Sequence, residues 1–318
     1  MAIKANFTAG LLSVTGDNGD DAIAITGTRD ATTGQIQQIL INGGAISVQG
    51  DPLTNANEID VFGGNGNDTI SLDNVAPPAG QALPTAHLFG GNGNDTFIWD
   101  PGDGSDTIEG QAGFDTLLFN GNGTNEQMSI SANGSRATLF RAQGNVTMDL
   151  NSVERIQLDA FGGADTITVR DLTGTDVKQV AIDLGGGDPD GNGDGQADTV
   201  NIFTSNHDVT FTDNNGVVTV SGLANEMTIS NFEANLDQLF INGQPVTIAN
   251  GQSVTVAAVN GNNIGGTSTA SDASYAAGLA LLGQHMASSF VTAGDGHGAT
   301  PIADQPSSHQ PLLTHPHA

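Results

Sequence analysis

One stretch of the sequence occurs twice in nearly the same letters, at residues 61–73 and at residues 88–100. Both copies contain the six residues G-G-N-G-N-D, and glycine at this density is unfavourable in a helix or strand interior, so it predicts a turn with positive φ angles or close backbone approach. After the aspartate, apolar residues alternate with polar ones, as at Ile70 and Leu72 and again at Phe97 and Trp99. This alternation predicts a strand with one buried face.

The composition of these turns favours calcium as a ligand. Glycine leaves backbone carbonyls unobstructed, each turn ends in a carboxylate, and Ca²⁺ takes six to eight oxygen ligands. One turn cannot supply that many oxygens, but two stacked turns can when the following strands lie in parallel register. The expected ligands in the two copies are Gly63, Asn65, Asp68, Gly90, Asn92 and Asp95.

Residues 63–71 and 90–98 resemble the calcium-binding repeats of type I secreted bacterial proteins, the repeats-in-toxin (RTX) or hemolysin-type family. The family pattern is G-G-x-G-x-D-x-U-x, where U is apolar, and both segments match it at every specified position. The resemblance implies calcium sites between stacked turns. The alternative is a glycine-rich loop of a β-solenoid that binds no metal.

Degenerate copies extend the pattern. Asp21 follows a turn at residues 16–20 in which Asp17 replaces the second glycine, and Asp103, Asp106 and Asp115 belong to two more closely spaced copies. Asp95 and Asp115 are 20 residues apart with Asp106 near the middle. This spacing predicts a two-sided roll in which Asp68, Asp95 and Asp115 form one column and Asp106 lies on the opposite side.

A second series of turns opens at Asp165, where the glycine turn is shorter and either a stacking corner or a calcium site is expected. The loop at residues 185–198 then places oxygen-bearing residues at alternate positions, as in an EF-hand loop, although Asn201 stands where that loop has a bidentate glutamate. The flanks are strand-like, so we expect either a solenoid loop that wraps its own calcium or a solvated acidic loop. The expected ligands in this loop are Asp188, Asp190, Asn192, Asp194 and Asp198.

These patterns predict an all-β chain, a right-handed parallel β-solenoid of the β-helix or β-roll type with a short C-terminal helix and a flexible tail. The expected divisions are a first solenoid series at residues 1–123, a second at 124–258 and the helix with its tail at 259–318. The helix is expected at about residues 275–286. The sequence of residues 280–290 and 311–318 resembles the C-terminal end of alphaproteobacterial calcium-repeat proteins, which implies that a type I exporter recognises this end.

Charge and targeting signals restrict the possible partners. The chain has 35 Asp and Glu against 7 Lys and Arg, a formal net charge of −28, and no cysteine. Nucleic acid and anionic membranes are poor partners for such a surface, and bound cations are expected to be linked to folding. We expect no signal peptide and no membrane span, so export through the C-terminal tail predicts a secreted or cell-surface protein.

The sequence therefore predicts a secreted calcium-binding solenoid that is not an enzyme and has a structural, adhesive or surface-interaction role, with itself or a cell-surface polysaccharide as partner. The alternative is a polysaccharide lyase or epimerase on the same scaffold, with Arg155 and Arg170 on one face of the coil to stabilise developing charge. No lipase-type elbow, zinc-protease helix or P-loop motif is present. The tail histidines His309, His315 and His317 are expected to bind metal only weakly.

Overall fold

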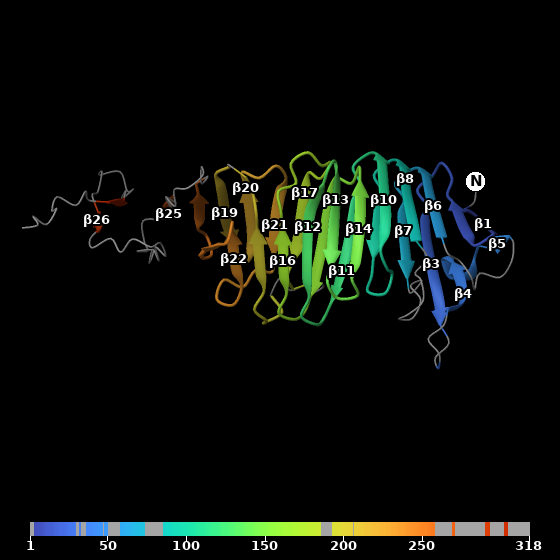
Figure 1. The fold of residues 1–318 in the computed structure, drawn as a ribbon, viewed down its shortest axis with the longest axis horizontal. Helices are drawn as coiled ribbons and strands as arrows, with labels where there is room; N and C mark the ends of the chain where they lie inside the picture. Colours follow the sequence, from blue (N-terminus) through green and yellow to red (C-terminus); the bar gives the residue numbers. More distant parts are fainter. Residues whose placement is uncertain are drawn as a thin grey trace, which may run out of the picture.

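The computed structural model describes residues 3–29, 32, 36–46, 48–49, 58–73, 85–185, 193–205, 207–257, 269–270, 290–292 and 302–304. Within these residues the chain is all-β, as the sequence predicts, and its one helical element is the short 3₁₀ turn η1 (Asn42–Gly44). The strands run across the long axis of the molecule, and the sequence advances steadily along that axis (Figure 1). The predicted C-terminal helix and tail lie outside the described residues.

Two large sheets contain nearly all of the strands. The first sheet, with 13 strands, consists of β1 (Lys4–Thr8), β2 (Leu11–Thr15), β5 (Val48–Gln49), β6 (Glu58–Asn65), β8 (Thr85–Asn92), β10 (Asp106–Ala112), β12 (Gln127–Asn133), β13 (Arg136–Arg141), β14 (Val146–Asn151), β16 (Thr166–Val169), β18 (Thr199–Ile202), β22 (Gln238–Ile241) and β23 (Gln244–Val246). The second sheet, with 12 strands, consists of β3 (Ala22–Arg29), β4 (Ile36–Ile41), β7 (Thr69–Asp73), β9 (Thr96–Trp99), β11 (Thr116–Asn122), β15 (Arg155–Phe161), β17 (Gln179–Asp183), β19 (Val209–Asn214), β20 (Val217–Ser221), β21 (Glu226–Ser230), β24 (Ser253–Val256) and β25 (Thr269–Ala270). A separate hairpin pairs β26 (Phe290–Thr292) with β27 (Ile302–Asp304).

The chain alternates between the two sheets, and successive visits to the same sheet pair in parallel. In the first sheet β6 pairs with β8 and β8 with β10, while in the second sheet β7 pairs with β9 and β9 with β11. We call one passage through both sheets a coil. Because the register is exact from coil to coil, chemically equivalent residues of neighbouring coils lie directly beside one another.

Two antiparallel meanders interrupt this parallel stacking. In the first sheet β13 lies between β12 and β14 and is antiparallel to both, and in the second sheet β20 lies in the same way between β19 and β21. In each meander the first strand does not pair with the preceding strand of its sheet, and the third strand does. In the first sheet β14 pairs with β10, and in the second sheet β21 pairs with β17. Both sheets therefore continue across residue 124, where the sequence loses its glycine turns.

A thin apolar layer fills the space between the sheets. In β11 and β15 every second side chain is buried, and the residues between them are half-buried. The largest buried side chains include Trp99 and Phe119, whose rings stack with centroids 4.0 Å apart. The Trp99 indole N–H donates a hydrogen bond to the carbonyl oxygen of Gly104 at 2.8 Å, so the buried ring also fixes the loop that follows β9.

Candidate metal centre

Five coils turn from the first sheet into the second at the same side of the molecule, and an acidic residue ends each turn. These residues directly precede β3, β7, β9, β11 and β15, and the parallel register aligns them in one row. We call this row the first acidic column. Its members are Asp21, Asp68, Asp95, Asp115 and Glu154.

Hydrogen bonds connect the column from coil to coil. The backbone N–H of Asp68 donates to Oδ1 of Asp95, and the N–H of Asp95 donates to Oδ1 of Asp115, both at 2.8 Å. The N–H of Asp21 donates to Asp68 Oδ1 and that of Asp115 to Glu154 Oε2, again at 2.8 Å. Asp68, Asp95, Asp115 and Glu154 therefore each use one oxygen to hold the preceding coil in register.

The second carboxylate oxygen in the middle of the column is buried without a partner. Oδ2 of Asp68, Asp95 and Asp115 has no hydrogen-bond partner, and each residue is at most 1% exposed. At the N-terminal end the geometry differs, because Asp21 Oδ2 accepts the backbone N–H of Asp17 at 2.6 Å. A buried carboxylate oxygen without a hydrogen bond is costly unless a cation or a proton neutralises it.

A glycine five residues before each aspartate makes room for this oxygen. A Cβ added to Gly63 would lie 2.4 Å from Asp68 Oδ2 and 2.5 Å from the carbonyl oxygen of Gly90. A Cβ added to Gly90 would lie 2.2 Å from Asp95 Oδ2 and 2.8 Å from the carbonyl oxygen of Gly110. Each corner thus brings an unpartnered carboxylate oxygen and a backbone carbonyl of the next coil to the same small space, which the glycine leaves open.

Burial changes the acidity of the column. Desolvation raises the pKa of Asp68 and of Asp115 to about 6, with a smaller contribution from the neighbouring carboxylates, and it also raises the pKa of Asp95. The backbone N–H groups that these carboxylates accept oppose the increase. The corners therefore favour either protonated side chains or a bound cation, and their oxygen donors are of the kind that calcium prefers.

Asn65 and Asn92, which the sequence predicts as ligands, do not lie in the buried corners with the aspartates. The Asn92 side-chain amide donates to Asn65 Oδ1, and the Asn65 amide donates to Asn18 Oδ1, both at 2.6 Å. These exposed side chains form an amide ladder along the outside of the turns. The accepting oxygens belong to Asn65 and Asn18, and this ladder is exposed, whereas the aspartate oxygens are buried.

A second acidic column lies on the opposite side, where the chain returns from the second sheet to the first. The N–H of Glu126 donates to Asp165 Oδ1 at 2.7 Å, the N–H of Asp165 to Asp198 Oδ1 at 2.7 Å, and the N–H of Asp198 to Asp237 Oδ1 at 3.0 Å. Oδ2 of Asp165 is buried without a partner. Burial raises the pKa of Asp165 and of Asp198 to about 7, and nearby carboxylates contribute further.

Arg141 contacts the acidic residue that begins the second acidic column. Its Nε donates to Glu126 Oε1 at 2.6 Å, its Nη2 pairs with the same oxygen, and its guanidinium lies 5.6 Å from the centroid of the Trp99 ring. Glu126 Oε2 accepts the backbone N–H of Asn122 at 2.8 Å. Both charged side chains are almost fully buried. At this end of the column, Arg141 therefore neutralises the buried carboxylate of Glu126.

The remaining predicted ligands are only partly brought together. Asp106 lies opposite the first acidic column, as its spacing predicts, with Oδ1 buried and unpartnered and with a pKa that burial raises to about 7. Asp103 is buried in the loop before it and accepts the N–H of Asp100 at 2.6 Å. Asp194 accepts the N–H groups of Gly163 and Gln196, each at 2.8 Å. Asp188, Asp190 and Asn192 lie outside the described residues, so the predicted calcium loop stays a prediction.

Three column members were missed by the sequence patterns: Glu154, Glu126 and Asp237. A usable signal exists for Glu126, because Gly121 stands five residues before it, and a Cβ at Gly121 would lie 2.4 Å from Glu126 Oε2. The same spacing relates Ala160 to Asp165, so this turn is not shortened but has alanine at the first glycine position. Glu154 and Asp237 have no glycine at that spacing, and only the register identifies them.

Comparison with known proteins does not assign the chain to a family. The chain matches no protein-family model and no curated protein sequence. In the part of the chain that the structure describes, no helix is long and apolar enough to cross a membrane.

Proposed function

We propose that this protein is a secreted, calcium-binding, right-handed β-solenoid whose folding depends on extracellular calcium and which has a structural or surface-interaction role. The observation that carries the proposal is the row of buried, unpartnered Oδ2 atoms of Asp68, Asp95 and Asp115. Asp165 Oδ2 on the opposite side is also buried without a partner and supports the same proposal. Each of these oxygens is tolerable only when a proton or a cation neutralises it.

Calcium suits these corners better than other cations. The groups available are carboxylate oxygens and the carbonyls of Gly90, Gly110 and Ser152, which lie close to the glycine positions of the preceding coil. Hard oxygen ligands in a tolerant arrangement favour Ca²⁺, whereas Mg²⁺ demands nearly ideal octahedral geometry. Bound calcium would supply positive charge between coils that otherwise repel one another.

The charge of the whole chain links this binding to folding. With a formal net charge of −28 the folded chain repels itself, and stacking the coils concentrates carboxylates in two columns. At millimolar calcium and a Kd of ~10⁻⁴ M, each site contributes about 1.4 kcal/mol, so three sites contribute about 4 kcal/mol, a large part of a domain's stability of ~5–15 kcal/mol. At sub-micromolar cytosolic calcium this contribution is absent, so the chain stays unfolded for export.

The C-terminal tail supplies the export signal in this proposal, through its resemblance to the tails that type I exporters read. The partner outside the cell is the protein itself or a cell-surface polysaccharide. For the alternative enzyme function, Arg155 begins β15 in the second sheet and Arg170 follows β16 in the first, so the two arginines do not share one sheet face. The described residues therefore favour the structural role.

Calcium binding by the full chain, measured by isothermal titration, tests the proposal. The variants Asp68→Asn and Asp95→Asn keep the size of the side chain but remove the charge, and each should bind fewer calcium ions than the wild type. Glu226→Gln removes a charge from an exposed side chain and should bind as many as the wild type. Unchanged calcium stoichiometry in both aspartate variants would contradict the proposal.

A further inference from the structure

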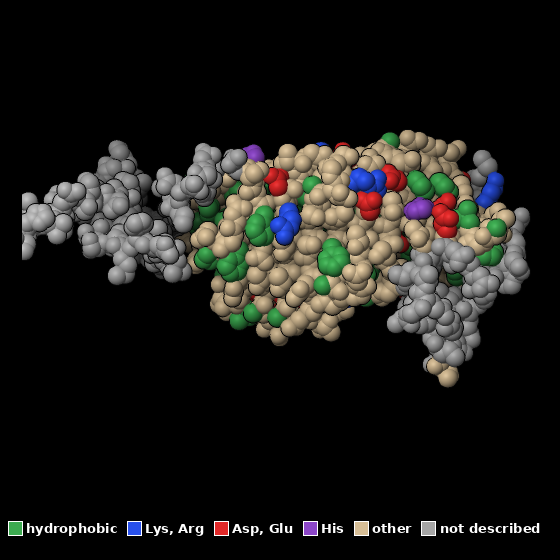
Figure 2. All heavy atoms as spheres, viewed as in Figure 1, with side chains coloured by type: hydrophobic (Ala, Val, Ile, Leu, Met, Phe, Trp, Pro, Cys, Tyr) green, Lys and Arg blue, Asp and Glu red, His purple; other side chains and the backbone are tan. Residues whose placement is uncertain are grey.

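The outer face of the first sheet carries a group of three side chains that belong to neither acidic column. Asp60 in β6 lies directly opposite His87 in β8, and Glu58 lies two residues before Asp60 on the same face. His87 Nδ1 is 3.2 Å from Asp60 Oδ1 and 3.5 Å from Glu58 Oε1. All three potential ligand atoms lie within 4.8 Å of one another, and Figure 2 shows a histidine beside acidic side chains on this face.

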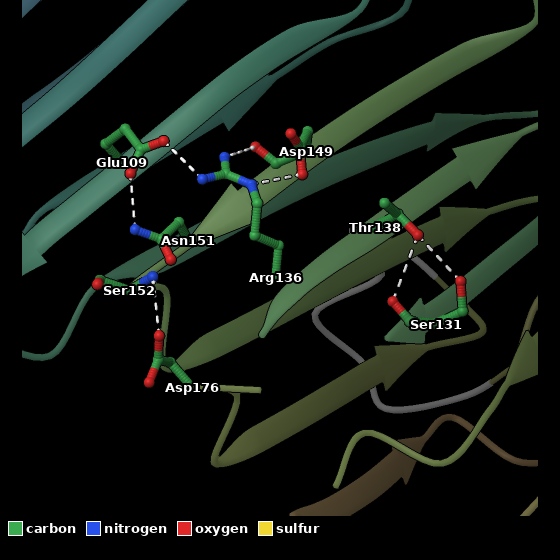
Figure 3. Close-up of polar contacts among 8 residues, drawn as sticks. All are labelled: Glu109, Ser131, Arg136, Thr138, Asp149, Asn151, Ser152 and Asp176. Atoms are coloured by element: carbon green, nitrogen blue, oxygen red, sulfur yellow. Dashed lines mark hydrogen bonds and ion pairs between the residues drawn. The ribbon is translucent and has the colours of Figure 1, made fainter. Parts of the chain in front are cut away.

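The charge balance around this group differs from that of its neighbours on the same face. Arg136 pairs with Glu109 through Nη1 at 2.7 Å and with Asp149 through Nε at 2.8 Å, as Figure 3 shows. In the part of the chain that the structure describes, neither Glu58 nor Asp60 has a Lys or Arg partner, and His87 is the basic group that they contact. Two carboxylates therefore converge on one imidazole without a permanent positive charge.

The pairing of β6 with β8 fixes the backbone positions of these residues. Phe62 and Phe89 are the next outward residues along the same two strands, and their rings stack with centroids 4.8 Å apart. The strands are in parallel register from Glu58 to Asn65, so the backbone positions of the three ligands are fixed. The His87 side chain is 33% exposed and that of Asp60 is 22% exposed, so an ion can reach them while other coordination positions stay open to water.

We propose that Glu58, Asp60 and His87 form a binding site for a divalent transition-metal ion such as Zn²⁺, separate from the two acidic columns. The imidazole nitrogen distinguishes this site, because a mixture of one nitrogen and two carboxylate oxygens suits Zn²⁺ and its first-row neighbours, whereas calcium takes oxygen ligands alone. His87 Nδ1 must be unprotonated to bind the metal, and the open positions are filled by water or by a group of a partner molecule.

The test is zinc titration of the full chain in saturating calcium. Since six other histidines would obscure the result, the parent chain carries Gln at the remaining positions: His207, His285, His297, His309, His315 and His317. This parent should bind one Zn²⁺, and adding His87→Ala or Asp60→Asn should weaken its zinc affinity at least about tenfold, because even residues that only orient a ligand change metal affinity by about 10- to 100-fold.

Two controls make the result decisive. Far-UV circular dichroism in calcium should be the same for all variants, because the three side chains lie on the outer face and not in the core. The variant Glu109→Gln, made in the same parent, removes an acid of the same sheet face that Arg136 already neutralises, and it should leave zinc affinity unchanged. A parent that binds no zinc, or an His87→Ala variant with unchanged affinity, would overturn the proposal.

Discussion

At the scale of single residues, the two carboxylate oxygens of Asp68, Asp95 and Asp115 have different roles. One oxygen accepts the backbone N–H of the preceding coil, as between Asp68 and Asp95, and fixes the register. The other oxygen is buried without a partner in the space left by a glycine five residues earlier. The glycine therefore leaves room for this oxygen, while the aspartate supplies both a hydrogen-bond acceptor and an oxygen that a proton or a cation must neutralise.

Replacing Gly90 by alanine tests the role of this space. The new Cβ would lie 2.2 Å from Asp95 Oδ2 and 2.8 Å from the carbonyl oxygen of Gly110, so the corner must shift. The free energy of unfolding in calcium should fall by about 1–3 kcal/mol, as measured by urea denaturation. Gly123→Ala is the matched control, because nothing lies within 4 Å of its Cβ position. Equal stability of the two variants would contradict this role.

The raised pKa values predict an unusual pH dependence when calcium is absent. The folded-state pKa is raised to about 6 at Asp68 and Asp115 and to about 7 at Asp165, whereas the unfolded value is about 3.9. Between these values the folded chain binds more protons than the unfolded chain, so the free energy of unfolding should rise by about 1.4 kcal/mol per pH unit for each extra proton as the pH falls.

Circular dichroism in EDTA measures this effect. The β-sheet signal should be stronger at pH 5.5 than at pH 8, since protons replace the missing cations at the buried oxygens. In calcium the signal should be complete at pH 8, because deprotonated carboxylates are then the better ligands. A β-sheet signal in EDTA that decreases on acidification would show that these carboxylates are not neutralised in the way proposed.

At the scale of elements, the glycine turns and the strand alternation were sufficient to predict the column of Asp68, Asp95 and Asp115 and the opposite position of Asp106. The meander of β12, β13 and β14 was not predictable, because alternation shows that a segment is a strand but not which neighbour it pairs with. For the same reason no local signal identifies Glu154, because it joins the column only after the meander is complete. Glu126 has one in Gly121, although its acid is glutamate and the repeat pattern has aspartate.

Arg141 ends β13, the middle strand of this meander, and neutralises the buried carboxylate of Glu126 from within the chain. Arg141→Met should lower the free energy of unfolding by about 3–5 kcal/mol, because it leaves the buried Glu126 carboxylate unpaired. Urea denaturation in calcium measures the loss, and adding Glu126→Gln to this variant should recover part of it.

Arg136→Met provides the comparison for the buried pair. Arg136 is 25% exposed on the outer face, so its loss should cost about 1 kcal/mol or less. If Arg141→Met and Arg136→Met reduce stability by the same amount, Arg141 does not serve as the internal cation of the second acidic column.

At the scale of the whole molecule, two long sheets run along the same axis (Figure 1), and a thin apolar core lies between them. Their strand register aligns acidic residues in two columns on opposite sides. The apolar layer stabilises the stack, while the aligned carboxylates oppose it unless they are neutralised. A chain with 35 acidic and 7 basic residues cannot neutralise both columns from its own side chains. We therefore expect the fold to depend on an external cation when these carboxylates are deprotonated.

Far-UV circular dichroism of the full chain in EDTA at pH 8, followed by titration with calcium and separately with magnesium, tests this dependence most directly. We predict a largely unfolded spectrum in EDTA, a transition to β-structure at about 10⁻⁴–10⁻³ M calcium, and no comparable transition with magnesium. A complete β-sheet spectrum in EDTA at pH 8 that calcium leaves unchanged would contradict the proposal that calcium drives folding.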